Sequence, residues 1–130
     1  MYRTIDKFAT IKSIVLNYFN IFVLFVAVFL LANGFLHDFF VIQQHKGPYD
    51  RNLMRLLMDG HLLIISGIIY LIAFFLLRQN NSIGLYLCLA NAVSLLVYCI
   101  LIYPFLKSFA TIALNLLVIV GVMARLFLKF

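Results

Sequence analysis

The residues best suited to chemistry lie together at the start of a long apolar run. The stretch RLLMDGHLLII carries Arg55, Asp59 and His61, which supply a cation, a carboxylate and an imidazole. Arg55 and Asp59 are four residues apart, so on a helix they share a face and can form an ion pair. His61 lies about 200° around the helix axis from Asp59, and a dyad between these two would require the helix to unwind at Gly60. The spacing therefore predicts one charged pair and a histidine that faces elsewhere.

The charged pair belongs to a longer polar stripe. At about 100° per residue, Ser66 and Tyr70 fall on the same helix face as the pair. Near the end of the preceding apolar run, Asn33 and His37 are also four residues apart and share a face. Polar side chains of membrane helices point into the bundle or towards the interface. The predicted ligand-binding residues are Asn33, His37, Arg55, Asp59, Ser66 and Tyr70.

Metal and cofactor chemistry has weaker support in the sequence. The candidate metal ligands are His37, His45 and His61, but their spacings of eight and sixteen residues match no compact ligand motif. We therefore predict no cofactor, and in particular neither haem nor zinc. The chain also has no nucleophile elbow and no glycine-rich phosphate loop, so we do not expect an enzyme.

The composition indicates an integral membrane protein. Hydrophobic residues make up 66% of the 130-residue chain and charged residues only 11%, whereas soluble domains contain roughly 45–50% apolar residues. The formal net charge is +6, but the basic residues are scattered and mostly flank the apolar segments. This distribution favours membrane lipids over nucleic acid as the partner.

Hydropathy predicts an all-α integral membrane protein, a four-transmembrane-helix bundle in a single membrane domain of residues 1–130. The expected helices cover residues 14–36, 53–77, 83–103 and 109–128, each near or above the roughly 20 residues that cross a bilayer. Short connections predict an up-down-up-down bundle with both termini on the same side. The longer connection, residues 37–52, begins with an apolar segment that either continues the first helix or lies in the membrane interface.

The basic residues favour cytoplasmic termini, because cytoplasmic segments carry an excess of lysine and arginine. The terminal side carries Arg3, Lys7, Lys12, Arg78, Arg125 and Lys129, and the other side carries Lys46, Arg51, Arg55 and Lys107. We therefore expect a protein of the bacterial inner membrane. The layout of four spans with a longer first connection is similar to that of the DoxX-like group of small bacterial membrane proteins, in architecture and not in a shared motif.

Polar residues of the third and fourth spans are interpreted as packing positions. Small side chains let membrane helices approach closely, and amides form hydrogen bonds between them. The predicted helix-packing residues are Gly84, Cys88, Asn91, Ser94 and Asn115. We expect the third span to be the central one.

The sequence supports three functional hypotheses. The first is a protein that binds a small amphiphile, a lipid or a quinone-like molecule, at a polar pocket near the outer interface. The second is an accessory or anchor subunit of a larger membrane complex, which the small size favours. The third is a subunit of an oligomeric transporter or channel, because four helices would have to associate to enclose a conduit. The expected partners are membrane lipids and either further copies of the chain or a larger complex.

Overall fold

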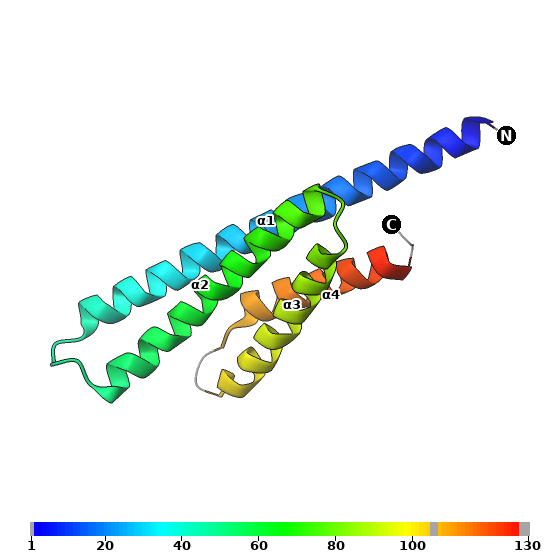
Figure 1. Ribbon diagram of the computed structural model, residues 1–130. Helices are drawn as coiled ribbons and strands as arrows, with labels where there is room; N and C mark the ends of the chain where they lie inside the picture. The colour runs from blue at the N-terminus through cyan, green and yellow to red at the C-terminus, as the bar shows by residue number, and fades with distance from the viewer. Residues whose placement is uncertain (1, 105–106, 128–130) are drawn as a thin grey trace.

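The computed structural model describes residues 2–104 and 107–127, which form helices and no strand. The helices are α1 (Tyr2–Gln44), α2 (Arg51–Arg78), α3 (Ile83–Ile102) and α4 (Phe109–Phe127). Each contains a segment long and apolar enough to cross a membrane. Successive helices run in opposite directions, so the first turns of α1 and the last turns of α4 lie towards the same end (Figure 1). The described residues thus confirm an all-helical chain with four candidate membrane spans.

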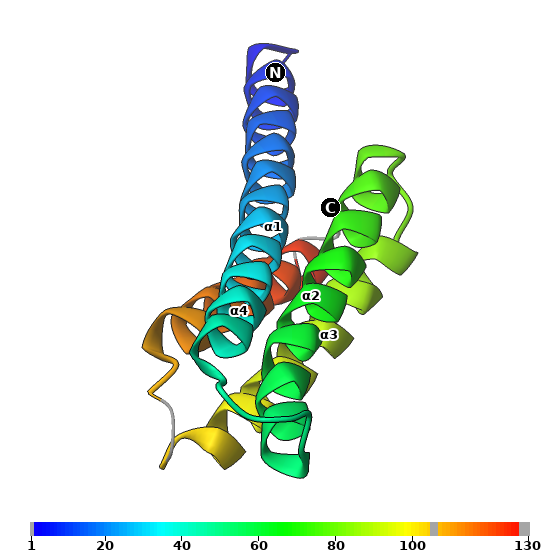
Figure 2. The same cartoon turned by 90° about the vertical axis from the view of Figure 1, so that its left-hand side faces the viewer.

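The first helix is longer than the sequence pattern predicts. Hydropathy places its end near residue 36, whereas α1 continues to Gln44. The apolar segment after His37 is therefore part of the helix. No proline or glycine interrupts residues 35–46, and the first helix breakers are Gly47 and Pro48. At about 1.5 Å per residue α1 is roughly 65 Å long, and its N-terminal part projects beyond the other helices (Figure 2).

Caps fix both ends of α2. The Asp50 carboxylate accepts a hydrogen bond of 2.8 Å from the Leu53 backbone N–H, as expected of an aspartate N-cap. At the other end the chain turns at Asn80, whose φ of 56° lies in the left-handed region that asparagine tolerates better than most residues. The Asn81 backbone N–H then donates to the Leu76 carbonyl at 2.9 Å. This turn reverses the chain and leaves polar side chains at this end of the bundle.

Glycines bring the helix backbones close together. A Cβ atom at Gly34 of α1 would lie 2.7 Å from the backbone oxygen of Gly60 in α2. One at Gly67 would lie 3.0 Å from the Ala27 backbone oxygen, so α1 and α2 are in contact at several levels. At Gly84 of α3, a Cβ atom would lie 2.9 Å from a backbone oxygen of α2. A side chain at these positions would push the helices apart.

Both α2 and α3 are inner helices of the bundle, whereas the sequence predicts α3 as the central one. Helix α2 packs against α1 and α3, and α3 packs against α2 and α4. A hydrogen bond between Tyr70 and Asn115 also joins α2 to α4. Small residues allow close contact on two faces of α2, with Gly67 against α1 and Ala73 against α3. Of the predicted packing residues Gly84, Cys88, Asn91, Ser94 and Asn115, all are buried except Ser94, which is exposed.

Large apolar side chains cover the outside of all four helices. Phe25 on α1, Ile72 on α2, Ile100 on α3 and Leu117 on α4 are each at least half exposed. So much exposed apolar surface is unfavourable in water. It is the surface expected of helices that face lipid or another apolar partner.

Candidate functional site

Buried polar side chains in the middle of the bundle fasten the helices to each other. The Tyr70 hydroxyl donates to the Asn115 side-chain oxygen at 2.6 Å, and the Asn115 amide donates to the Thr111 carbonyl at 2.7 Å. The Asn91 amide donates to the backbone carbonyl of Ser66 at 3.0 Å. The bonds from Tyr70 to Asn115 and from Asn91 to Ser66 join different helices, as side-chain hydrogen bonds commonly do in membrane proteins, whereas the bond from Asn115 to Thr111 lies within α4. Ser66 and Tyr70, both predicted to bind a ligand, instead lie in the packed core.

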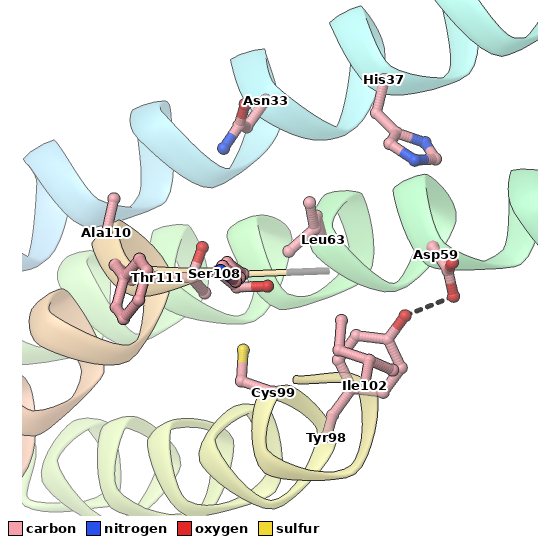
Figure 3. Close-up of a pocket in the computed structure, with 12 residues that line it drawn as sticks. Asn33, His37, Asp59, Leu63, Tyr98, Cys99, Ile102, Ser108, Ala110 and Thr111 are labelled. Atoms are coloured by element: carbon pink, nitrogen blue, oxygen red, sulfur yellow. Dashed lines mark hydrogen bonds between the residues drawn. The ribbon is translucent and has the colours of Figure 1, made fainter. Parts of the chain in front are cut away.

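A polar pocket lies between α1, α2 and α3 and is closed at one end by the start of α4. Its volume is about 300 Å³. We call it the Asp59 pocket, and its lining is formed by Asn33, His37, Asp59, Leu63, Tyr98, Cys99, Ile102, Lys107, Ser108, Phe109, Ala110 and Thr111. Figure 3 shows the side chains of Asn33 and His37 directed from α1 towards the space above Leu63 and Asp59. Three of the six predicted ligand residues, Asn33, His37 and Asp59, therefore share one pocket.

The carboxylate of Asp59 is held by a tyrosine from the neighbouring helix. The Tyr98 hydroxyl donates a hydrogen bond to Asp59 Oδ1 (Figure 3). Arg55 is exposed and, among the side chains that the structure describes, forms no ion pair with Asp59. It lies outside the Asp59 pocket, in a separate shallow depression that Asp59 also borders. In place of the expected ion pair with Arg55 on the same helix, Asp59 has a hydrogen bond with Tyr98 on α3.

Gly60 allows α1 to approach α2 beside the pocket. The helix α2 is continuous through this residue, so the sequence stretch contains no unwound turn and no dyad between Asp59 and His61. A Cβ atom at Gly60 would overlap the Asp38 carboxylate and lie 2.9 Å from His37 Nδ1. His37 Nδ1 lies 3.4 Å from Asp38 Oδ1, and both side chains are partly buried. The glycine therefore provides the space that these two polar side chains occupy.

The three histidines lie in different environments. His37 lines the Asp59 pocket, whereas His61 is exposed and borders a separate groove with Tyr49 and Met54. His45 Nε2 is 2.9 Å from the Pro48 carbonyl, in the connection between α1 and α2. Within residues 2–104 and 107–127, no group of three or more histidine, cysteine or acidic side chains is placed to hold a metal ion.

Several pocket residues were not among the predicted site residues. Tyr98, Lys107, Ser108 and Thr111 come from the end of α3 and the start of α4. The antiparallel order of the helices places this connection at the same end of the bundle as the α1–α2 connection (Figure 1). The predicted up-down-up-down order could have identified these residues as candidates. It brings the end of the third span and the start of the fourth to the membrane face that carries Asp59.

Comparisons with known proteins give no relative: no family model and no curated protein matches the sequence, and no solved structure matches the fold. The residues of the chain are therefore the basis for a functional assignment.

Proposed function

We propose that the protein spans a membrane and binds the polar head of a small amphiphile, a lipid or a quinone-like molecule, in the Asp59 pocket. The observation that carries this proposal is that one open pocket is lined by acidic, basic and hydroxyl-bearing residues, among them Asp59, Lys107 and Tyr98. Its volume of about 300 Å³ is at the lower end of the roughly 300–1,000 Å³ of small-molecule sites. It suits a headgroup rather than a whole lipid.

The position of the pocket along the helices supports an amphiphilic ligand. The polar lining lies where α3 ends at Ile102 and α4 begins at Phe109. In a spanning bundle this level corresponds to one boundary of the apolar layer. A polar head would bind beside Asp59 and Lys107, while the apolar tail would lie along Leu63, Ile102 and outward-facing helix surfaces.

We further propose that the termini are cytoplasmic and that the pocket faces the outer leaflet of the bacterial inner membrane. The excess of basic residues on the terminal side supports this orientation. The pocket would then open at the leaflet opposite the one that carries the termini.

Filling the pocket with a larger side chain tests the proposal. Ala110 lines the Asp59 pocket, whereas Ala113 is exposed on the same helix outside it. Native mass spectrometry of protein released gently from membranes would measure the retained small molecule. We expect Ala110→Phe to lower its occupancy at least about fivefold, since the ring takes up headgroup space, and Ala113→Phe to retain it. Equal retention in both variants would contradict the proposal.

A second candidate function is that of an accessory subunit, because the end of α1 exposes aromatic side chains. Phe35, Phe39 and Phe40 are each more than half exposed near the α1–α2 connection. Aromatic residues are enriched at protein interfaces. A stoichiometric protein partner in the same mass spectra, lost on Phe39→Ala but not on Phe25→Ala, would favour this function.

A further inference from the structure

A buried arginine lies at the end of the bundle opposite the Asp59 pocket. Arg125 is in the last turns of α4 and is only 5% exposed. Its Nη1 donates to the side-chain oxygen of Asn20 at 3.0 Å, and its guanidinium carbon lies 5.2 Å from the centre of the Phe19 ring. Its Nε atom is buried without a hydrogen-bond partner. A guanidinium has five N–H donors, so much of its donor capacity is unused by the described side chains.

No described carboxylate neutralises this cation. Asp38 and Asp50 flank the α1–α2 connection, and Asp59 lies in the pocket at that same end. Arg125 lies at the other end of the bundle, near the turn between α2 and α3. Burying a charge without an opposite charge is unfavourable. Among the described side chains, the Arg125 guanidinium therefore has no acidic partner.

The arginine faces a second pocket, with a volume of about 310 Å³. Its lining combines Asn80, Asn81 and Ser82 of the α2–α3 turn with Arg125. Leucines from α1, α2 and α3 complete the lining. We call this the Arg125 pocket. It shares no residue with the Asp59 pocket.

The turn presents hydrogen-bond donors to this pocket. Ser82 is the N-cap residue of α3, but its side chain makes no capping hydrogen bond, so its hydroxyl is free to bind a ligand. The Asn81 side-chain oxygen accepts from the Ile83 backbone N–H at 3.0 Å, which leaves the Asn81 amide group as the donor. The N-terminus of α3 adds a partial positive charge at the same place. The lining thus combines a cation with hydroxyl and amide groups, which are donors that an oxyanion can use.

The depth of the Arg125 pocket fits a phosphate group. Arg125 lies two residues before the end of α4, and Ser82 directly precedes α3. The pocket is therefore level with the ends of the apolar helices, where lipid phosphates lie in a spanning bundle. A tetrahedral oxyanion can accept hydrogen bonds from several directions, and arginine is the preferred residue for binding it.

We propose that the Arg125 pocket binds an anionic phosphate group, carried either by a lipid headgroup or by a soluble phosphate ester. The Arg125 guanidinium neutralises the charge, and the Ser82 hydroxyl and the Asn81 amide, from the same lining, donate to the oxygens. This site is separate from the proposed amphiphile site, so a negative binding result at one pocket does not contradict the proposal for the other.

A matched pair of substitutions at Ser82 tests the proposal without disturbing the fold. Aspartate and asparagine are both as good as serine at a helix N-cap, and they have nearly the same shape. Ser82→Asp places a carboxylate opposite Arg125 and occupies the anion site, whereas Ser82→Asn adds no charge. A third variant, Arg78→Gln, removes an exposed cation at the same end that does not line the pocket.

The measurement is the binding of phosphatidylglycerol, phosphatidylcholine and inorganic phosphate to the delipidated full chain in detergent, at matched ionic strength. We expect Ser82→Asp to weaken binding of the preferred anion at least about tenfold more than Ser82→Asn does, and Arg78→Gln to change it by less than about threefold. Preference for phosphatidylglycerol over inorganic phosphate identifies a lipid headgroup, and comparable binding of the two identifies a soluble phosphate group.

Two results would contradict the proposal that the Arg125 pocket binds a phosphate group. One is that neither anion binds better than phosphatidylcholine or chloride. The other is equal binding by Ser82→Asp and Ser82→Asn, confirmed by an unchanged affinity in Arg125→Lys, which keeps the charge but removes the planar guanidinium group.

Discussion

The Tyr98 hydroxyl of α3 donates a hydrogen bond to the Asp59 carboxylate of α2, and this bond joins the two helices at the wall of the polar pocket. Only Oδ1 of the carboxylate is used in this bond. The second oxygen can therefore accept a hydrogen bond from a ligand. The described side chains thus give Asp59 a partner on α3, and Arg55 of its own helix is exposed.

Removing the tyrosine hydroxyl should weaken the contact between α2 and α3. Tyr98→Phe leaves the partly buried Asp59 carboxylate without its donor, and we expect a loss of about 1 kcal/mol in the free energy of unfolding. Tyr86→Phe is the control, because Tyr86 is exposed on the same helix. Unfolding of the purified protein in mixed micelles measures both. An equal effect of the two substitutions would show that the hydrogen bond contributes no stability.

The bond between Tyr70 and Asn115 should couple α2 to α4. A double-mutant cycle with Tyr70→Phe and Asn115→Ala isolates this interaction from the separate bond that Asn115 donates to the Thr111 carbonyl. Buried hydrogen bonds between membrane helices average about 0.6 kcal/mol and reach about 1.7 kcal/mol, and we expect a coupling free energy in that range. Fully additive single effects would mean that the two side chains act independently.

Because α1 packs closely against α2, adding one methyl group between them should lower the stability of the protein. A Cβ atom at Gly34 would lie 2.7 Å from the Gly60 backbone oxygen, which cannot move without the helix. We expect Gly34→Ala to destabilise the protein by about 1–3 kcal/mol. Gly47→Ala is the matched control, since its Cβ atom would make only an ordinary contact, 3.5 Å from His45 Nε2. Thermal unfolding that is equally affected by both substitutions would contradict this account of the interface.

The proposed orientation predicts from which side of the membrane a reagent can label each connection between helices. In a background without Cys88 and Cys99, a cysteine at Gln44 should react with an impermeant reagent added outside intact cells. A cysteine at Gln79, in the exposed turn after α2, should react only after the cells are opened. The reverse pattern would place the termini outside.

The sequence alone predicts the helices well and their contacts less well. Spans of about 20 apolar residues and the three breaks at Gly47-Pro48, residues 79–82 and Pro104 predict four helices, because length and hydropathy are local properties. Hydropathy leaves open whether the apolar segment after His37 continues the first helix or lies in the interface, and the structure shows that it continues α1 to Gln44. In the structure His37 and Asp38 both fit against Gly60, which no local pattern indicates.

The candidate site was only partly predictable, because a polar stripe on one helix does not say which residues of other helices it meets. The stripe of Arg55, Asp59, Ser66 and Tyr70 is divided in the structure. Arg55 is exposed, Asp59 lines the pocket, and Ser66 and Tyr70 are in the core. Tertiary contacts decide these roles, as the bond from Tyr98 to Asp59 shows.

The most direct test of the central proposal compares the retained small molecule in Asp59→Asn and Arg55→Gln by native mass spectrometry. Asparagine keeps an oxygen acceptor for Tyr98 but removes the charge, whereas Arg55 lies outside the Asp59 pocket. We predict that Asp59→Asn lowers ligand occupancy about tenfold and that Arg55→Gln leaves it unchanged. Wild-type occupancy in Asp59→Asn, or a loss confined to Arg55→Gln, would contradict the assignment of the Asp59 pocket as the ligand site.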